Sequence, residues 1–569
     1  MEVTEARAGR ASDAPEREKK RLPLLDRLLR EQQQLTAVER FAQRHADVSV
    51  PLQEPYYRAL LPATPPGPGQ QYGFEVDLDK CTGCKACVAA CHSLNGLDEG
   101  ETWRSVGLLH GGTQQAPVQK TVTTACHHCV DPACMKGCPV SAYEKDPVTG
   151  IVRHLDDQCI GCQYCIFTCP YEVPQFNASK GIVRKCDMCS GRLAQNEAPA
   201  CVQACPNGAI AIRVVDRERM VEDAQGDAFL PGAPSPGITV PTTVYLTKEA
   251  LPRNVLPADF YSVRPAHEHT PLVVMLVLTQ LATGALVVDQ VLGQLLGSAQ
   301  IAVLRPLQAS TALALGVLAL LASTLHLGRP QYAFRALLGI RTSWMSREIL
   351  AFGAFAGLAS AYALAVSPLA ARLPEPLAGL LARGGPALGP LAAVAGCASV
   401  GCSVMLYQIT QRTWWSGGRT AFKFFGTAAV LGTATTLAIG MLTLPGFEGP
   451  SGTLLSTLAG ILPILVGAKL VGELSVLLHL RDRRQGDLKR SALLLVTHLA
   501  YALRLRLTCA VLGALVAPLA CRAALEAQSQ VWAAGWMVAG LLLLIAGELC
   551  ERFTFFAALS SPRMPGGFR

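Results

Sequence analysis

Apolar residues are distributed unevenly along the 569-residue chain. Residues 1–268 are polar and rich in charge, whereas residues 269–558 are mostly apolar. Within the apolar half we count eight stretches that reach the roughly 20 residues a helix needs to cross a bilayer. They lie near 271–292, 306–327, 349–370, 387–408, 424–445, 454–479, 500–520 and 531–550. This pattern predicts an all-α membrane domain of eight transmembrane helices within residues 269–569.

The polar half divides into three parts. Residues 1–70 form an extension in which LPLLDRLLREQQQLTAVERFAQRHA repeats apolar residues at helical spacing, and we expect a helix that packs on the next domain or on a partner. Residues 71–216 carry regularly spaced cysteines between short strand-like runs such as YGFEVDL and AIAIRVV, which predicts a small α+β domain. Residues 217–268 include FLPGAPSPGITVPTT, which indicates an irregular linker along a surface.

Lysine and arginine give the chain a net charge of +8, but their positions favour a membrane over nucleic acid as the partner. The loops after the second, fourth, sixth and eighth apolar stretches carry fifteen of them, and the opposite loops carry four. The fifteen are Arg329, Arg335, Arg341, Arg347, Arg412, Arg419, Lys423, Arg481, Arg483, Arg484, Lys489, Arg490, Arg552, Arg563 and Arg569. The positive-inside rule therefore predicts a multi-pass protein of the cytoplasmic (inner) membrane with residues 1–268 on the cytoplasmic side. The N-terminal MEVTEARAGRASDAPEREKK, which has no apolar core, gives the same expectation.

Sixteen of the 21 cysteines fall into four regular groups between Cys81 and Cys205. The groups are Cys81, Cys84, Cys87 and Cys91; Cys126, Cys129, Cys134 and Cys138; Cys159, Cys162, Cys165 and Cys169; and Cys186, Cys189, Cys201 and Cys205. Cysteines spaced by two residues can wrap one iron–sulfur cube from a tight turn, while a last cysteine followed by proline reaches a neighbouring cube. Sixteen thiolates fill four [4Fe–4S] clusters with none left over.

Other uses of cysteine fit the sequence less well. An odd total argues against a disulfide framework. Structural zinc also uses C-x-x-C pairs, but its pairs are usually separated by longer loops than the crowded CIGCQYCIFTCP allows. No C-x-x-C-H occurs, and histidines near the apolar stretches are few, so no haem is expected. One departure from the repeated pattern is His92, which stands where proline follows the last cysteine of the other groups.

With these groups, residues 72–216 resemble the four-cluster electron-transfer subunit of the dimethyl sulfoxide reductase family of molybdenum or tungsten enzymes. The resemblance implies two pseudo-symmetric ferredoxin-like halves in which the last cysteine of each group completes the cluster of another. The implied ligand sets are Cys81, Cys84, Cys87 and Cys205; Cys186, Cys189, Cys201 and Cys91; Cys126, Cys129, Cys134 and Cys169; and Cys159, Cys162, Cys165 and Cys138. Some relatives hold a three-iron cluster where one cysteine of the third group is replaced, and the presence of Cys162 predicts none here.

On the membrane side, the segment HLGRPQYAFRALLGIRTSWMSRE at 326–348 follows the second apolar stretch. A quinone site needs groups at the membrane surface that hydrogen-bond carbonyl oxygens and carry protons, and His and buried Glu can do both. For most of its arginines a topological role alone is the plainer interpretation. With MLYQITQRTWW and GELCERFTFF, this segment is similar to the membrane-anchor subunit of the same family over roughly 269–569. That resemblance implies a haem-free quinol site at His326 and Glu348, with Arg329 as a further candidate.

The chain thus resembles a fusion of two normally separate subunits, which predicts both fold and function. We expect an α+β ferredoxin-like domain with four clusters fused to eight transmembrane helices. The expected function is to relay electrons between membrane quinone and a catalytic molybdopterin subunit, as in anaerobic respiration. The chain would not be catalytic toward the terminal substrate by itself. Reductases of dimethyl sulfoxide, nitrate or polysulfide and oxidases of sulfite or formate share this pattern, so it leaves substrate and direction open.

Two alternatives follow from other features of the sequence. Charges inside the spans are costly in lipid, and Lys469 with Glu473, together with Asp289 and Glu548, could couple redox chemistry to ion movement. Lys469 and Glu473 lie four residues apart on one helix face, so structural pairing is the favoured interpretation. A structural anchor that feeds a soluble partner without quinone chemistry is the other alternative.

Overall fold

The computed structural model describes residues 23–34, 36–47, 53–295, 298–444 and 449–566. The chain divides into two compact units, Met1–Ala59 and Leu60–Arg569. The first contains α1 (Leu24–Gln33), α2 (Ala37–Ala46) and the single turn α3 (Glu54–Tyr57). Thr36 and Glu39 form a capping box at the start of α2, with Glu39 accepting from the Thr36 amide at 2.7 Å. Helix therefore forms where the sequence of the extension predicts it.

The cysteine domain at the start of the second unit is built on a sheet that joins its two ends. Strand β1 (Gln70–Asp77) pairs antiparallel with β8 (Ile210–Asp216), and β9 (Val244–Leu246) adds to β1 in parallel. These are the strand-like runs expected from YGFEVDL and AIAIRVV. Since β1 precedes the first cysteine group and β8 follows the fourth, this pairing brings those two groups together.

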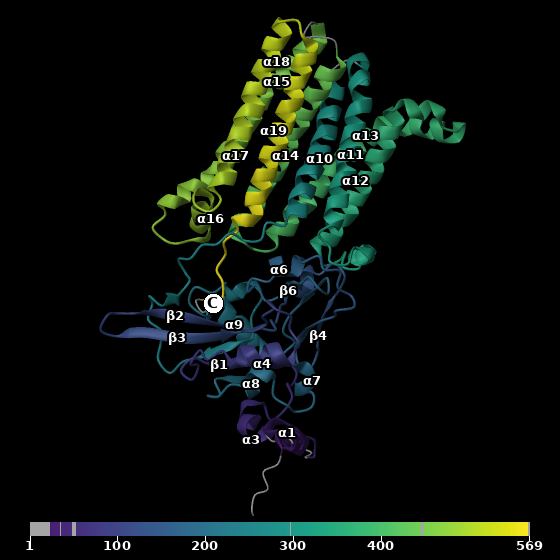
Figure 1. Ribbon diagram of the computed structural model, residues 1–569. Helices are drawn as coiled ribbons and strands as arrows, with labels where there is room; N and C mark the ends of the chain where they lie inside the picture. Colours follow the sequence, from purple (N-terminus) through teal and green to yellow (C-terminus); the bar gives the residue numbers. More distant parts are fainter. Residues whose placement is uncertain (1–22, 35, 48–52, 296–297, 445–448, 567–569) are drawn as a thin grey trace, which may run out of the picture. The chain divides into compact units, whose positions relative to one another are not determined.

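Hairpins and short helices complete the cysteine domain (Figure 1). The strands are β2 (Ser105–Gly112), β3 (Pro117–Thr124), β4 (Tyr143–Lys145), β5 (Val152–His154), β6 (Gln175–Asn177), β7 (Ile182–Arg184) and β10 (Leu256–Pro257). The helices are α4 (Ala86–Leu94), α5 (Ala133–Gly137), α6 (Tyr164–Thr168), α7 (Ser190–Leu193), α8 (Ala200–Gln203) and α9 (Arg217–Gln225). Helix α4 packs on α8, and α5 packs on α6, which gives the domain its two halves. The expected linker 217–268 also contributes α9, β9 and β10 to this domain.

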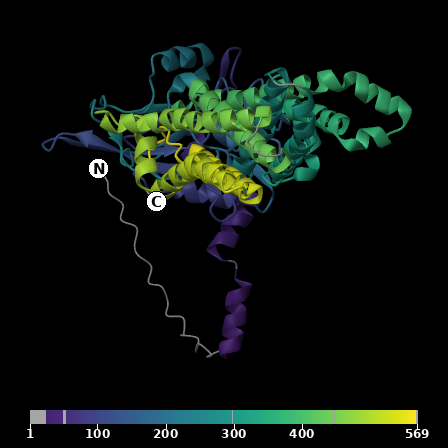
Figure 2. The same cartoon turned by 90° about the horizontal axis from the view of Figure 1, so that it is seen from above.

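Eight helices in the described part of residues 269–569 are long and apolar enough to cross a membrane, which confirms the expected fold class. They are α10 (Thr270–Leu295), α11 (Ser298–Thr324), α12 (Trp344–Val366), α13 (Glu375–Gln408), α14 (Gly417–Thr443), α15 (Gly449–Leu474), α17 (Ala500–Val511) continued by α18 (Ala517–Glu526), and α19 (Gln530–Ala557). A π-helical turn at Leu512–Val516 joins α17 to α18, and the short α16 (Asp487–Val496) precedes them. Viewed from above, the hairpin between α12 and α13 extends away from the other helices (Figure 2).

The C-terminal segment returns from α19 to the cysteine domain (Figure 1). The amide of Leu108 on β2 donates to the carbonyl of Gly566 at 2.9 Å, and the amide of Gly566 donates to Asp259 Oδ1 at 3.1 Å. A Cβ atom on Gly107 would lie 1.7 Å from the Pro565 carbonyl oxygen, so β2 needs glycine where the segment crosses it. The C-terminal segment is thus anchored on the cysteine domain.

Candidate functional site

The first and third cysteine groups fold into the same kind of loop. Gly83 and Lys85 in the first loop have positive φ angles of 73° and 61°, and Gly161 and Gln163 in the third have 70° and 60°. These left-handed residues turn the backbone around the centre of the loop, and a short helix, α4 or α6, begins immediately afterwards. The repeated backbone conformation points several thiols of one group towards a common centre.

The last cysteine of each group lies with the thiols of another group. A cavity is lined by Cys81, Cys84, Cys87 and Cys205. Most of the remaining thiols form three further neighbourhoods, in each of which the thiols are close enough to influence one another's ionisation. These neighbourhoods are Cys91 with Cys189 and Cys201; Cys126, Cys129 and Cys134 with Cys169; and Cys159, Cys162 and Cys165 with Cys138. These neighbourhoods agree with the ligand sets implied by the resemblance, which stay a prediction. Cys186 lies near Cys126 of another set as well as near Cys91 and Cys201.

The surroundings of the thiols suit iron–sulfur clusters. Backbone amides point at sulfur, with Ala209 donating to Cys205 Sγ and Ala142 to Cys138 Sγ, both at 3.2 Å. Burial raises the pKa of the free Cys91 thiol to about 12, so a thiolate there requires a cation such as iron. Clusters held by these thiolates would supply one-electron redox chemistry, tuned by such N–H···S bonds and by burial.

Two buried cations lie among the thiols, and neither was identified from the sequence. Lys185 Nζ is 3.6 Å from Cys126 Sγ and donates to the Cys186 carbonyl at 2.8 Å. Burial alone would lower the pKa of Lys185, but the negative charge of the neighbouring Cys126 and Cys134 thiolates raises it above its ordinary value. Arg104, which is 2% exposed, donates to Thr123 Oγ1 at 3.1 Å beside the first and fourth groups. The position of Lys185 directly before a C-x-x-C pair was the available signal.

The third cysteine group lies against the loop that follows the second span. The amide of Arg329 donates to the Ile160 carbonyl at 3.0 Å, and Gly328 to Gly161 at 3.4 Å. A Cβ atom on Gly328 would come within 2.1 Å of the Gly181 carbonyl oxygen, so this approach requires glycine. Tyr164, between two cysteines of the group, donates its hydroxyl to the Leu406 carbonyl on α13 at 2.7 Å. The third group is therefore seated on the membrane domain.

The second cysteine group is held in a similar way by the loop before α12. Gly339 donates its amide to the Pro139 carbonyl, and Ser343 its hydroxyl to the Gly137 carbonyl, both at 2.7 Å. By contrast, Cys84 in the first group is exposed. The cysteine sets thus extend from the membrane domain to an exposed position on the cysteine domain.

Three histidines from two separated segments meet at the third cysteine group. The ring of His326 lies 5.2 Å from that of His269, which lies 4.6 Å from the ring of His267 and 4.9 Å from that of Phe167 (centroid distances). Burial lowers the pKa of His326 to about 4 and that of His269 to about 3, so both imidazoles are neutral near pH 7. His326 Nε2 is buried without a hydrogen-bond partner among the described residues. Sequence reasoning missed His267 and His269, although AHEHT immediately precedes the first apolar stretch.

Glu348 lies at the start of α12 and is 7% exposed. Its carboxylate accepts a short hydrogen bond from the Ser403 hydroxyl on α13 and is within electrostatic range of Tyr164 and Tyr407. Because Tyr164 belongs to the third cysteine group, Glu348 lies beside that group, as His326 does.

Arg329 is placed differently from the other two predicted quinone residues. Its guanidinium donates to the carbonyl oxygens of Asp156 at 2.9 Å and Lys180 at 3.2 Å, both in the cysteine domain. These contacts attach the domain to the membrane loop and leave the side chain directed away from the bundle.

An apolar cavity lies within the bundle near Glu348. It lies between α10, α11 and α12, and its lining includes Thr279, Val317, Leu320 and Phe352. Phe352 is one helical turn after Glu348, and Val317 is 44% exposed at the outside of the bundle. The cavity has a volume of about 10 Å³, hardly enough for one water molecule, and Glu348 is not part of its lining.

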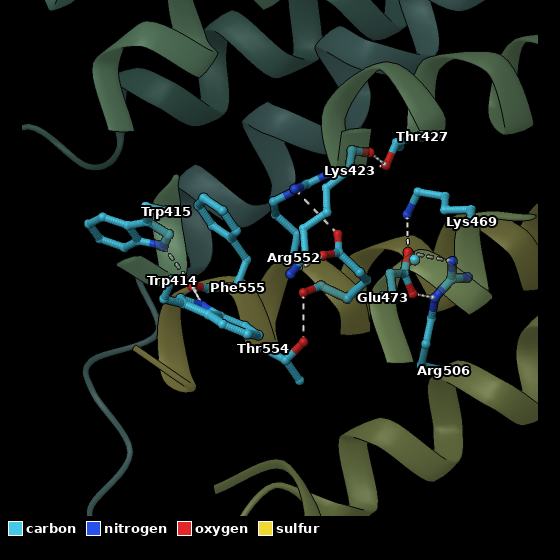
Figure 3. Close-up of polar contacts among 12 residues, drawn as sticks. Trp414, Trp415, Lys423, Thr427, Lys469, Glu473, Arg506, Arg552, Thr554 and Phe555 are labelled. Atoms are coloured by element: carbon cyan, nitrogen blue, oxygen red, sulfur yellow. Dashed lines mark hydrogen bonds and ion pairs between the residues drawn. The ribbon is translucent and has the colours of Figure 1, made fainter. Parts of the chain in front are cut away.

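Elsewhere in the bundle, seven charged side chains from four helices form two groups of ion pairs (Figure 3). Thr427, which donates to Glu548 and accepts from Arg552, links the two groups into one buried ionic network. The network consists of Lys423 on α14, Lys469 and Glu473 on α15, Arg506 on α17, and Glu548, Glu551 and Arg552 on α19. Lys469 Nζ lies 2.8 Å from Glu548 Oε2 and also pairs with Glu473, which confirms the expected structural pairing. Arg506 joins the same two carboxylates, at 3.1 Å from Glu473 and 2.8 Å from Glu548.

The rest of the network corrects two positions in the sequence interpretation. The apolar pattern assigns Lys423 and Arg552 to loops, but they are 4% and 0% exposed inside α14 and α19. Both contact Glu551, at 3.2 and 3.3 Å. The helices extend beyond their apolar stretches, which sequence hydropathy could not show because buried pairing makes charge tolerable there. The expected orientation stays a prediction.

Three parts of the sequence match known protein families. Residues 72–93 match a 4Fe-4S binding domain, and residues 118–215 match a 4Fe-4S dicluster domain. Residues 265–558 match the DMSO reductase anchor subunit (DmsC). That last match covers more than half of the 569 residues.

Curated relatives match about a quarter to a third of the chain. A chain of the anaerobic dimethyl sulfoxide reductase of Haemophilus influenzae is 38% identical over 184 residues, which are 31% of this protein and 88% of the relative. A chain of the same enzyme from Escherichia coli strain K12 is 39% identical over 157 residues, which are 26% of this protein and 76% of the relative. The iron–sulfur subunit of the nitrate-inducible formate dehydrogenase from that strain is 34% identical over 168 residues, which are 26% of this protein and 57% of the relative.

The two sets of matches do not overlap, and they follow the boundary between the cysteine domain and the membrane helices. The first part is an iron–sulfur electron-transfer domain like the dimethyl sulfoxide reductase chains it matches, and the second is a multi-pass membrane anchor. The protein belongs to the DMSO reductase anchor subunit family, and in it the anchor is fused to an iron–sulfur domain of the dimethyl sulfoxide reductase type.

Proposed function

We propose that the chain relays electrons between a membrane quinone and a catalytic molybdopterin subunit through four [4Fe–4S] clusters. In this proposal residues 71–216 hold the clusters, one for each set of four cysteines, and residues 269–569 hold the quinone site. The relatives are chains of dimethyl sulfoxide reductase and formate dehydrogenase, which supports a catalytic partner. The chain alone would not act on the terminal substrate.

The observation that carries the proposal is the seating of the third cysteine group on the segment that contains His326 and Glu348. Backbone hydrogen bonds at Ile160 and Gly161 fix this contact, and the Tyr164 hydroxyl adds a bond to the Leu406 carbonyl on α13. An electron donor bound among these side chains would be next to the third group, while the exposed Cys84 marks the opposite end for the soluble partner. Electrons could then cross the domain in steps between neighbouring sets.

The residues at the junction can perform the proton chemistry that quinol oxidation requires. A quinol loses two electrons and two protons, so its hydroxyl groups need acceptors at hydrogen-bond distance. The unpartnered ring nitrogen of His326 and the carboxylate of Glu348 are such acceptors. Arg329 stays in the proposal, but its contacts support docking of the domain more than binding of the headgroup.

The proposal places the protein in the cytoplasmic membrane with the iron–sulfur domain on the cytoplasmic side. The excess of basic residues in the loops adjoining that domain supports this orientation. A tag on either end of the chain, probed with protease in sealed vesicles of known polarity, tests it directly.

The proposed function is tested first by composition and then by kinetics. The complex purified through this chain should contain about sixteen irons per chain, stoichiometric molybdenum or tungsten, and no haem. In stopped-flow mixing with a quinol analogue, His326→Gln and Glu348→Gln should each slow cluster reduction by about 10²-fold or more, with iron content unchanged.

The matched control is Asp289→Asn, which removes a buried carboxyl that instead contacts Tyr362 at 2.5 Å in the same bundle. It should reduce its clusters at the wild-type rate. Wild-type rates in both His326→Gln and Glu348→Gln would refute the quinone site, and iron without molybdenum or tungsten would remove the proposed partner.

A further inference from the structure

The buried ionic network contains one positive charge too many. Its cations are Lys423, Lys469, Arg506 and Arg552, and its carboxylates are Glu473, Glu548 and Glu551. All seven side chains are at most 10% exposed and lie in helices that cross the membrane. A net charge in such surroundings is costly, so the network is most stable when one cation has given up its proton.

The contacts show which cation that is. Arginine keeps its proton in proteins, which leaves the two lysines. Lys469 is held between Glu473 and Glu548, so its charge is well compensated. Among the described residues Lys423 is ion-paired with Glu551 alone, at 3.2 Å, with Glu473 acting on it from farther away. Arg552 contacts the same Glu551 carboxylate at 3.3 Å. Lys423 is therefore the network's exchangeable position.

On one side, Lys423 faces aromatic residues that lead to the third cysteine group. Its Nζ lies 4.3 Å from the ring centre of Trp414. Trp414 and its neighbour Trp415 both donate their indole N–H groups to the Phe555 carbonyl, at 2.9 and 3.0 Å (Figure 3). Trp415 in turn meets the ring of Phe167, in the third group, at 5.4 Å. Aromatic rings thus lie between the third cysteine group and Lys423.

On the other side, Tyr407 connects the network with the proposed quinone site. Its ring packs against Phe555 at 5.0 Å and Phe424 at 5.9 Å. Its hydroxyl is within electrostatic range of both Glu348 and Arg552. The network therefore adjoins the proposed quinone site, where protons would be released, and the third cysteine group, where electrons would arrive.

We propose that Lys423 is a proton-exchange site whose occupancy follows the redox state of the adjacent iron–sulfur clusters. The inference rests on the proposed quinone function. One quinol O–H bond breaks, one electron leaves to the clusters, and the proton forms a new N–H bond on the neutral Lys423 amine. The added positive charge on Lys423 is balanced by the added electron. When the electron passes on towards the catalytic partner, Lys423 releases the proton.

No other described group around Lys423 is as well placed to exchange a proton. The charged groups that act on Lys423 directly are Glu473 on α15 and Glu551 and Arg552 on α19. Lys469 on α15, Arg506 on α17 and Glu548 on α19 complete the network, and Tyr407 on α13 interacts with Arg552. The carboxylates are each paired with at least two cations, which favours their ionised form. The arginines are fixed in their charge, and Lys469 is doubly paired.

The test is a mediated redox titration of the purified complex, followed by electron paramagnetic resonance at pH 6, 7 and 8. Because reduction takes up a proton, one wild-type cluster potential should fall by about 59 mV per pH unit, the one-electron equivalent of a tenfold change. Lys423→Arg keeps the charge and the ion pair but cannot release a proton, so this slope should vanish. Lys489→Arg makes the same change at a half-buried lysine outside the network, whose ammonium donates to the Asp482 carbonyl, and should keep the slope.

Two results would overturn the inference. One is a set of wild-type potentials that do not change with pH, and the other is a wild-type slope retained in Lys423→Arg. Iron content is measured in every variant, and the wild-type titration decides even where a variant does not assemble. The titration uses chemical mediators and no quinol, so its outcome is independent of the quinol kinetics that test the proposed function.

Discussion

Replacing Lys185 by methionine removes a buried positive charge beside the second cysteine group while keeping much of the side chain's volume. The ammonium lies 3.6 Å from Cys126 Sγ. At an effective dielectric constant of about 20, a full charge at that distance contributes about 4 to 5 kcal/mol. An added electron spreads over a whole cluster, so we expect a fraction of this, about 1 to 3 kcal/mol. For a one-electron couple this corresponds to about 50 to 130 mV.

Lys185→Met should therefore lower the midpoint potential of the cluster bound by Cys126 by about 50 to 130 mV, because the reduced cluster loses its cation. Electron paramagnetic resonance during a redox titration measures this directly. The control is Lys136→Met, which removes an exposed lysine paired with Asp131 near the same group, and solvent screening should leave its potentials unchanged. Potentials in Lys185→Met that stay within about 20 mV of wild type would show that the buried charge does not act on the cluster.

Two further predictions concern stability. Arg506→Leu leaves Glu473 and Glu548 with Lys469 as their only close cation in the network. We expect the free energy of unfolding to fall by about 3 to 5 kcal/mol, which a lower Tm in detergent would show. An unchanged Tm would contradict a structural role for the network. The buried neutral His269 has its pKa lowered to about 3 from 6.5, whereas the unfolded chain takes up a proton below about 6.5. Below about pH 6.5 the unfolded state binds more protons than the folded state at this histidine. The free energy of unfolding therefore decreases as the pH falls from about 6.5 towards 3. Tm measured against pH should fall less steeply in His269→Gln than in wild type, and parallel curves would exclude this histidine as a cause.

Fusion of the two domains has a physical consequence for the junction. In a single chain the docking of the cysteine domain is intramolecular, so its effective concentration does not depend on expression of a partner. The C-terminal segment adds a second connection between the domains through its contacts with Leu108 and Asp259. The cysteine domain is therefore connected to the membrane domain both before α10 and after α19, and both connections favour the close approach at Gly161 and Gly328.

Some features follow from the sequence because they depend on short segments. Cysteine spacing defines each loop by itself, since one tight turn such as that at Gly161 places several thiols around one centre. Apolar runs identify the eight spans, because each helix that crosses the bilayer must itself be long and apolar enough to do so. Predictions of this kind identified the fold class, the iron–sulfur domain and the anchor family.

The sequence located helix ends less well. It placed Lys423 and Arg552 in loops because hydropathy treats every charge as exposed, and a charge paired inside the bundle breaks that assumption. Only the folded chain shows that Glu551, on α19, contacts both of them.

What the tertiary structure alone decided are the relations between distant segments. The grouping of Cys91 with Cys201, the approach of His269 to His326, and the assembly of one ionic network from four helices each join residues far apart in the sequence. A linear pattern reports how each segment partitions between water, lipid and protein. It does not report how helices rotate and pack against one another, and that packing decides which buried charges meet.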